Sequence, residues 1–309
     1  MRIKFSAIDL LLLLMVFFWG ANITVIKVAL RHFHPAVFNC SRFLVAGVTM
    51  LILYRKVFDD PVDKKELSRL LLLGILGNTI YQFLFIGGVN YTHVSHASIL
   101  LGTSPIFTAS LSSILGHEKV GSKIWLGILL SFSGIILIVF GAGNVQAANS
   151  RNILGDLFIV LASLMWSIYT TFSKRIVNEY SWQHYILYTL LFGTMFLVPI
   201  SLPYFFKQDW SVIGILDWGA VLYSGLMALV FGYSVWYYSV RRIGSTRTAV
   251  YGNLTPVAGV SVGMIFLGDR LTLLQWMGAL VILSGLILIR LTKPIAADPN
   301  ASLVEIPEP

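Results

Sequence analysis

The sequence predicts an all-α integral membrane protein with ten transmembrane helices, arranged as two inverted five-helix repeats around a central cavity. Three observations predict it: a composition poor in charge, ten long apolar runs, and an internal repeat. Of the 309 residues, 57% are hydrophobic and only 12% are charged. Soluble domains carry about 25% charged residues, because a folded surface must be solvated. The single cysteine, Cys40, excludes an intramolecular disulfide and a cysteine-based metal cluster.

Each apolar run is long enough to cross a bilayer as a helix, which takes about 20 residues. Helix is favoured over strand because the runs lack the alternation of a lipid-facing barrel. Pro35 opens the second run, Gly121-Ser122 precedes the fifth, and Pro199 with Pro203 is expected to end the seventh. The runs cover residues 8–28, 37–54, 69–89, 95–115, 123–141, 153–173, 183–203, 217–239, 247–266 and 272–291.

The first run follows a basic N-terminus and resembles a signal peptide, but it is too long and no cleavage site follows it. It is therefore predicted to be an uncleaved first helix, with a capping box formed by Ser6 and Asp9. Residues 294–309 are predicted to form a disordered cytoplasmic tail. Lysine and arginine concentrate in alternate loops, which predicts that both termini lie on the cytoplasmic side of the cell membrane. The net charge of +8 is explained by these loops, so no nucleic-acid partner is expected.

The internal repeat divides the chain into residues 1–148 and 149–293. Hydrophobic helices match by chance at leucine, but seldom at tryptophan, proline and lysine in order. Because five is an odd number, the second copy begins on the opposite side of the membrane, as in many secondary transporters. An offset of 147 aligns Asp9, Trp19 and Lys27 with Asp156, Trp166 and Lys174, and an offset of 151 aligns Pro105, Trp125 and Gly134 with Pro256, Trp276 and Gly285.

These residues carry a family resemblance. The chain resembles EamA-type ten-helix permeases of the drug/metabolite transporter superfamily, through Trp19-Gly20-Ala21-Asn22 with Lys27, Pro105 with Glu118, and Pro256 with Gly268-Asp269. His117-Glu118 and Gly268-Asp269 depart from the Gly-Glu that the family commonly shows at these places. The resemblance implies export of metabolites or amino acids from the cytoplasm and does not fix a substrate.

Two prolines point to a substrate site. Pro105 and Pro256 fall near the centres of the fourth and ninth runs, where proline removes a helical hydrogen bond and kinks the helix. Equivalent interruptions in two repeats are the best sequence indication of a transporter binding site, although a kink used only for packing is the alternative. Gly102 and Asn253 lie one turn earlier and are included in the predicted site.

Aromatic and amide residues at helical spacing predict the wall of the cavity. Gln82 and Phe85 align with Tyr233 and Trp236, and an apolar wall with few polar groups is typical of small-molecule sites. The alternative is an aromatic belt at the membrane surface, which fits tryptophans near run ends better than tryptophans in mid-run. The predicted wall comprises Trp19, Asn22, Gln82, Phe85, Trp166, Tyr169, Tyr233, Trp236 and Tyr237.

Two cations lie inside apolar runs without a topological reason, Lys27 and Arg42. Lys27 is hypothesised to attract carboxylate-bearing substrates in the outer half of the cavity, and nearby Arg42 could act with it. The alternative for Lys27 is interaction with the dipole at its helix C-terminus. No carboxylate lies near the centre of a run, which argues against proton coupling through a buried acid.

A carrier working by alternating access is therefore the predicted function, with a small-molecule substrate and the lipid bilayer as partners. A membrane-embedded enzyme is the alternative, but the sequence has neither HExxH nor GxSxG. A channel is the other, although no ring of charge or filter loop is visible. No cofactor is predicted, and His93 with His96 lacks a third ligand for a metal. The small-residue stripes Gly127-x-x-x-Ser131 and Gly259-x-x-x-Gly263 suit packing within the chain or in a homodimer.

Overall fold

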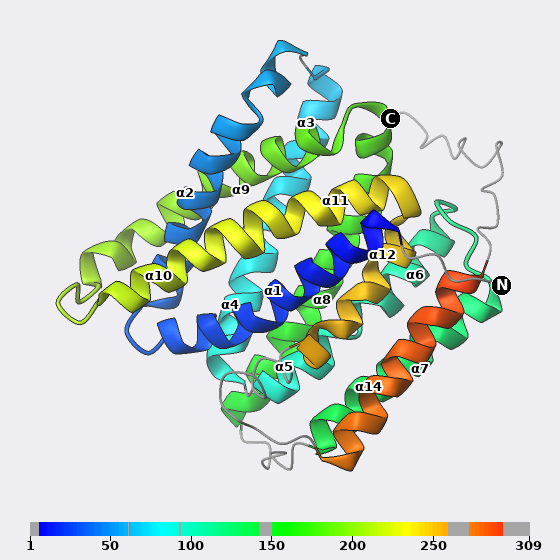
Figure 1. Cartoon of the computed structure of the whole chain (residues 1–309). Coiled ribbons are helices and arrows are strands. Elements are labelled where there is room, and N and C mark those ends of the chain that lie inside the picture. Colours follow the sequence, from blue (N-terminus) through cyan, green and yellow to red (C-terminus); the bar gives the residue numbers. More distant parts are fainter. Residues whose placement is uncertain (1–5, 61, 93, 142–149, 259–271, 293–309) are drawn as a thin grey trace.

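The computed structural model describes residues 6–60, 62–92, 94–141, 150–258 and 272–292, and all the regular structure in these ranges is helical (Figure 1). The predicted tail 294–309, Gly259-x-x-x-Gly263 and Gly268-Asp269 lie outside the described residues. The first half contains α1 (Ala7–Ala29), α2 (Pro35–Leu53), a 3₁₀ turn η1 (Arg55–Asp59), α3 (Lys64–Gly74), the π-helical η2 (Ile75–Ile80), α4 (Tyr81–Tyr91), α5 (Val94–Leu101), α6 (Ser104–Ile114) and α7 (Ser122–Gly141).

The second half repeats much of this order. It contains α8 (Ser150–Glu179), α9 (Trp182–Lys207), α10 (Ile215–Tyr223), the π-helical η3 (Ser224–Phe231), α11 (Gly232–Ile243), α12 (Ser245–Tyr251), the 3₁₀ turn η4 (Gly252–Leu254) and α14 (Leu273–Leu291). The described residues include six helices that are long and apolar enough to cross a membrane, and three shorter apolar helices. The shorter ones are Ile99–Ile114, Ser122–Ile138 and Leu273–Ile289.

Local signals place several helix ends as the sequence predicts. The backbone N–H of Ser6 donates to the Asp9 carboxylate at 2.6 Å, which forms the predicted capping box of α1. Pro35 opens α2, where its missing N–H costs no helical hydrogen bond. The prediction that Pro199 and Pro203 end the seventh helix is wrong, because α9 continues through both to Lys207. Membrane helices tolerate proline where neighbours or local adjustment satisfy the freed carbonyl.

The long apolar helices Lys64–Tyr91 and Ile215–Ile243 both change to π geometry in mid-course, at η2 and η3. A π segment inserts an extra residue into a turn and often occurs at functional sites. Around Gly77 in η2 the backbone meets the ring of Tyr169, and a Cβ there would come within 2.4 Å of it. In η3 the carbonyl of Ala228 accepts a hydrogen bond from Trp19 Nε1 at 2.9 Å. Both segments therefore shape the interior of the bundle.

In the fourth apolar run the helix is broken, rather than only kinked, next to Pro105. α5 ends at Leu101, and α6 begins at Ser104 with Pro105 in its first turn. The break frees backbone carbonyls, and Ser163 Oγ of α8 lies 3.4 Å from the carbonyl oxygen of Leu101 and donates to it. In the described part of the ninth apolar run the corresponding irregularity is η4, which precedes Pro256.

α7 and α14 lie side by side at one edge of the bundle (Figure 1). Their contact depends on glycines: a Cβ on Gly134 would lie 2.6 Å from the carbonyl oxygen of Gly278, and a Cβ on Gly278 would lie 2.6 Å from that of Gly134. Gly127 and Gly285 are related in the same reciprocal way. The stripe that begins at Gly127 is thus occupied by α14 of the same chain.

Candidate functional site

A cavity of about 110 Å³ lies among α1, α2, α4, α8 and α11, and residues around Pro105 and Pro256 also line it. We call it the central cavity. Eleven of the fourteen site residues predicted from sequence line it. These are Trp19, Asn22, Gln82, Phe85, Gly102, Pro105, Trp166, Tyr233, Trp236, Asn253 and Pro256.

Lys27 does not line the central cavity. Its ammonium donates to three backbone carbonyls at the C-terminal end of α4, those of Val89 at 2.7 Å, Asn90 at 3.3 Å and Thr92 at 3.0 Å. The last carbonyls of a helix have no partner within the helix, and a cation is favoured there. Lys27 therefore caps the C-terminal end of the neighbouring helix α4. The alternative predicted from the sequence was a similar interaction, but with the dipole of its own helix, α1.

Tyr169 and Tyr237 are also outside the lining of the cavity and lie behind its wall. Tyr169 is fully buried, and its hydroxyl pairs with Asn78 Nδ2 at 3.1 Å and with Thr189 Oγ1 at 2.6 Å. Tyr237 is fully buried too, with its ring centroid 4.7 Å from that of Tyr185. Both tyrosines support the residues that face the cavity.

The aromatic wall is centred on Trp166. Its ring centroid lies 5.8 Å from that of Trp19, 5.4 Å from those of Tyr233 and Trp236, and 5.1 Å from that of Tyr81. Edge-to-face and tilted pairs at such distances are favourable, and buried indole N–H groups need an acceptor. Trp19 Nε1 donates to the carbonyl of Ala228, and Trp236 Nε1 to Thr170 Oγ1 at 3.2 Å. The wall is therefore held in a fixed geometry before any ligand enters.

The polar side of the cavity is a hydrogen-bonded network around Arg42 of α2. Arg42 is only 1% exposed, and its Nε donates to Asn39 Oδ1 at 3.0 Å. Its terminal nitrogens donate to Ser224 Oγ at 3.3 Å and to Gln82 Oε1. Gln82 Nε2 in turn donates to the Tyr233 hydroxyl at 2.9 Å. Among the described residues that line the cavity, Arg42 carries the one charged side chain.

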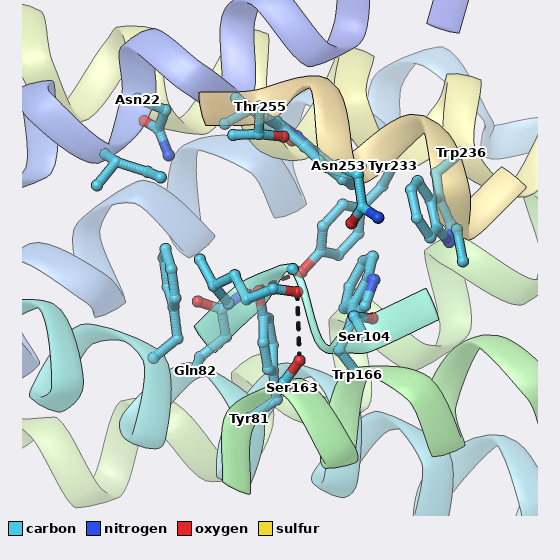
Figure 2. Close-up of a pocket in the computed structure, with 18 of the residues that line it drawn as sticks. Asn22, Tyr81, Gln82, Ser104, Ser163, Trp166, Tyr233, Trp236, Asn253 and Thr255 are labelled. Carbon is cyan, nitrogen blue, oxygen red and sulfur yellow. Dashed lines mark hydrogen bonds between the residues drawn. The ribbon is translucent and has the colours of Figure 1, made fainter. Parts of the chain in front are cut away.

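Asn253 forms a second polar point on the opposite side, in η4. It is 1% exposed, and neither atom of its side-chain amide has a hydrogen-bond partner among the described residues. Figure 2 shows this amide pointing into the cavity, together with Gln82, Tyr233 and Trp166. A buried polar group without a partner is uncommon in proteins.

The arrangement contains no set of groups suited to hold a metal. No three His, Cys, Asp or Glu side chains come together in the part of the chain that the structure describes. The side chains of His93 and His96 lie outside that part. What the cavity offers is a guanidinium, the amide of Asn253 without a described partner, and aromatic faces, all of which can bind a ligand.

Sequence reasoning left several lining residues out of the predicted site. Arg42 had a visible signal, since an ionisable residue inside a membrane span is by default a functional-site hypothesis. Tyr81 lies one turn before Phe85 and stacks on it at 5.7 Å, a spacing that the sequence contained. Hydroxyl residues carry no such signal in an apolar run. These are Ser104, Ser163 and Thr255.

Comparison with known proteins identifies the family. The EamA-like transporter family matches the chain twice, over residues 6–140 and 153–291. The chain belongs to this family. An uncharacterized transporter of Archaeoglobus fulgidus is 28% identical, and the alignment covers 92% of this chain and 97% of that protein. A protein of Escherichia coli named a probable amino-acid metabolite efflux pump is also 28% identical, over 89% of this chain and 92% of its own length.

This EamA-like chain also shares its fold with a solved crystal structure. That structure aligns with a TM-score of 0.74 at 16% identity, covering 92% of this chain and 96% of the other. Together with the apolar helices, family membership identifies the chain as a multi-pass integral membrane protein of a transporter family. The names of its relatives favour transport over catalysis.

Proposed function

We propose that this EamA-like protein exports small amphipathic metabolites, such as amino acids or related compounds, by alternating access through the central cavity. The observation that carries the proposal is a cavity with aromatic walls and sparse polar groups, lined by residues of both halves of the chain. Binding sites for small molecules have this composition. The name of the Escherichia coli relative, probable amino-acid metabolite efflux pump, supports the direction and the substrate class.

The carrier has ten transmembrane helices in two inverted repeats, 1–148 and 149–293. The double match of one family supports this organisation. Matching contacts support it further. A Cβ on Gly74 of α3 would lie 2.6 Å from the carbonyl oxygen of Thr189, and a Cβ on Gly225 of η3 would lie 3.0 Å from that of Arg42. Gly74 and Gly225 are 151 residues apart, and Arg42 and Thr189 are 147 apart. The two offsets that align the sequence repeat, 147 and 151, therefore also relate these two helix contacts to each other.

Both termini face the cytoplasm in this arrangement, because the basic loops do. Cysteine labelling tests this orientation, since native Cys40 is 1% exposed and remains protected. With a membrane-impermeant maleimide on intact cells, a cysteine at Asn149 reacts and one at Lys64 does not. Reaction of both positions from outside refutes the inverted arrangement.

Counterflow into proteoliposomes tests the transport mechanism. We expect saturable exchange of a small amphipathic metabolite, lowered by Tyr233→Ala and Trp236→Ala without loss of expression, because both rings form the cavity wall. Trp276→Ala is the matched control, since Trp276 is 52% exposed on α14 and does not line the cavity. Fast, unsaturable flux favours a channel, and chemical conversion of a lipid or sugar without transport favours an enzyme. A homodimer remains a prediction that cross-linking in the membrane tests.

A further inference from the structure

We propose that the central cavity selects organic anions: the guanidinium of Arg42 receives a substrate carboxylate, and Asn253 receives a second polar group of the same molecule. The preferred ligand is a small monocarboxylate with an apolar or aromatic body and a net charge of −1. This inference rests on the proposed transport function and narrows its substrate class, because zwitterionic amino acids and cations then bind less well.

The hydrogen bonds of Arg42 leave room for a ligand. A guanidinium has five N–H donors. Three of them have acceptors, which are Asn39, Ser224 and Gln82, all uncharged. One N–H on each terminal nitrogen has no acceptor among the described residues. Two donors on adjacent nitrogens are what a carboxylate needs for a bidentate contact.

The charge of Arg42 is also uncompensated. Its guanidinium carbon lies 5.9 Å from the ring centre of Phe38 and 5.7 Å from that of Phe43, so its other neighbours are aromatic. No aspartate or glutamate within the described ranges forms an ion pair with it. A buried charge is costly unless it is paired, so an entering anion supplies a missing counter-ion.

No aspartate or glutamate of the described ranges lines the cavity, and three of them bond elsewhere in the bundle. Asp9 accepts a hydrogen bond from the Tyr251 hydroxyl at 2.5 Å, Asp156 accepts one from Thr92, and Glu118 pairs with Lys174 at 2.8 Å. None of these three carboxylates lines the cavity. A substrate ammonium would therefore meet only neutral acceptors and the repulsion of Arg42. This charge balance favours a net anion over a zwitterion or an amine.

Asn253 supplies the second, independent observation. Its amide can both donate and accept, is 1% exposed, and has no described partner (Figure 2). A hydroxyl or amide on the ligand would satisfy it. The apolar body of the ligand would then lie between the two polar points, against the rings of Trp166 and Trp236.

Equilibrium binding to the purified protein in detergent tests the inference, because it avoids passive leakage of weak acids. The probes share a phenyl ring and differ in charge: 3-phenylpropionate, phenylalanine, phenethylamine and 3-phenylpropanamide. We expect 3-phenylpropionate to bind about tenfold more tightly than the neutral amide. A tenfold difference in affinity is the size of effect that one well-placed charged hydrogen bond gives. Arg42→Gln removes this preference, so that the acid and the amide bind with affinities within about twofold of each other.

Lys27→Gln is the matched control, since Lys27 is a cation in the same half that lies outside the cavity; it leaves the ranking of the four probes unchanged. If Arg42→Gln does not fold, the inference is tested with Arg42→Lys and with the order in which the wild-type protein binds the four probes. Equal binding of all four probes, tighter binding of phenylalanine or the amine, or a ranking unchanged in Arg42→Gln overturns the inference. If the anion preference is absent but neutral or zwitterionic compounds show saturable counterflow, the proposed transport function still stands. If no compound shows counterflow, both the anion selectivity and the transport function are refuted.

Discussion

Replacing Gly232 by alanine should loosen the wall of the central cavity, because Gly232 at the start of α11 lies directly against Trp19. A Cβ there would lie 2.3 Å from Trp19 Nε1 and 3.0 Å from Cε2. Non-bonded atoms prefer about 3.5 Å, so the indole must shift by about 1 Å. The shift breaks its hydrogen bond to Ala228 and disturbs the contact with Trp236, whose ring centroid is 5.2 Å away.

The magnitude follows from three contributions. Overpacking costs about 1–3 kcal/mol, and loss of the buried hydrogen bond adds about 1 kcal/mol. Alanine is favoured over glycine inside a helix by about 0.5–1 kcal/mol, which offsets part of the loss. A net loss of about 1–3 kcal/mol lowers the unfolding temperature by roughly 3–8 °C. A displaced Trp19 should also weaken substrate binding, seen as a raised KM with expression unchanged.

Gly219→Ala is the matched control. Gly219 lies on α10 in the same membrane-crossing helix, and a Cβ there has no other atom within 4 Å. We expect its unfolding temperature and its KM to equal those of the wild type or to improve slightly. The two variants are compared by thermal unfolding in detergent and by counterflow. If Gly232→Ala behaves like Gly219→Ala in both assays, the close contact with Trp19 does not exist in the protein.

Three further predictions concern positions around the cavity. Lys27→Met leaves the carbonyls at the end of α4 without their cation, so it should cost about 1–3 kcal/mol in unfolding measurements while the ratio of anionic to neutral substrate uptake stays constant. Gly134→Ala should separate α7 from α14 and lower the unfolding temperature, yet leave ligand affinity unchanged in binding assays, because neither helix lines the cavity. Burial raises the pKa of Glu118, but the Lys174 ammonium and the hydrogen bonds from Thr246 and Ser245 outweigh it, so its pKa lies below the ordinary 4.5. The stability that this carboxylate contributes is therefore present above pH 4.5 and lost as the pH falls through its lowered pKa, so the unfolding temperatures of wild type and Glu118→Gln should converge in acid.

Residue patterns predicted the helices well because their physical cause is local. A run of apolar residues long enough for the bilayer must satisfy its backbone within itself, and capping residues such as Ser6 and Pro35 set where it begins. The predicted helix end at Pro199 and Pro203 was wrong, since the hydrogen bond that each proline removes is not enough to end α9. The π segments had no sequence signal, because they depend on how Trp19 and Tyr169 pack from other helices.

The cavity was predictable to the extent that its residues share helical spacing. Gln82 with Phe85 and Tyr233 with Trp236 each face one way, and the structure brings both pairs to the same space. Depth alone could not separate Lys27 from Arg42, since both are cations in apolar runs. What separates them is the neighbour: exposed helix-end carbonyls meet Lys27, while neutral side chains and open space meet Arg42.

The polarity of the cavity comes from differences between equivalent positions of the two repeated halves. Asn22 corresponds to Tyr169 and Arg42 to Thr189 at an offset of 147. In the second half, the hydroxyl groups of Tyr169 and Thr189 are hydrogen-bonded at 2.6 Å, and both side chains are fully buried. In the first half, the smaller Asn22 and the charged Arg42 leave open space between them and the opposite wall. The two halves therefore share much of their packing, while Asn22 and Arg42, at the positions that hold a tyrosine and a threonine in the second half, give the cavity its polar side.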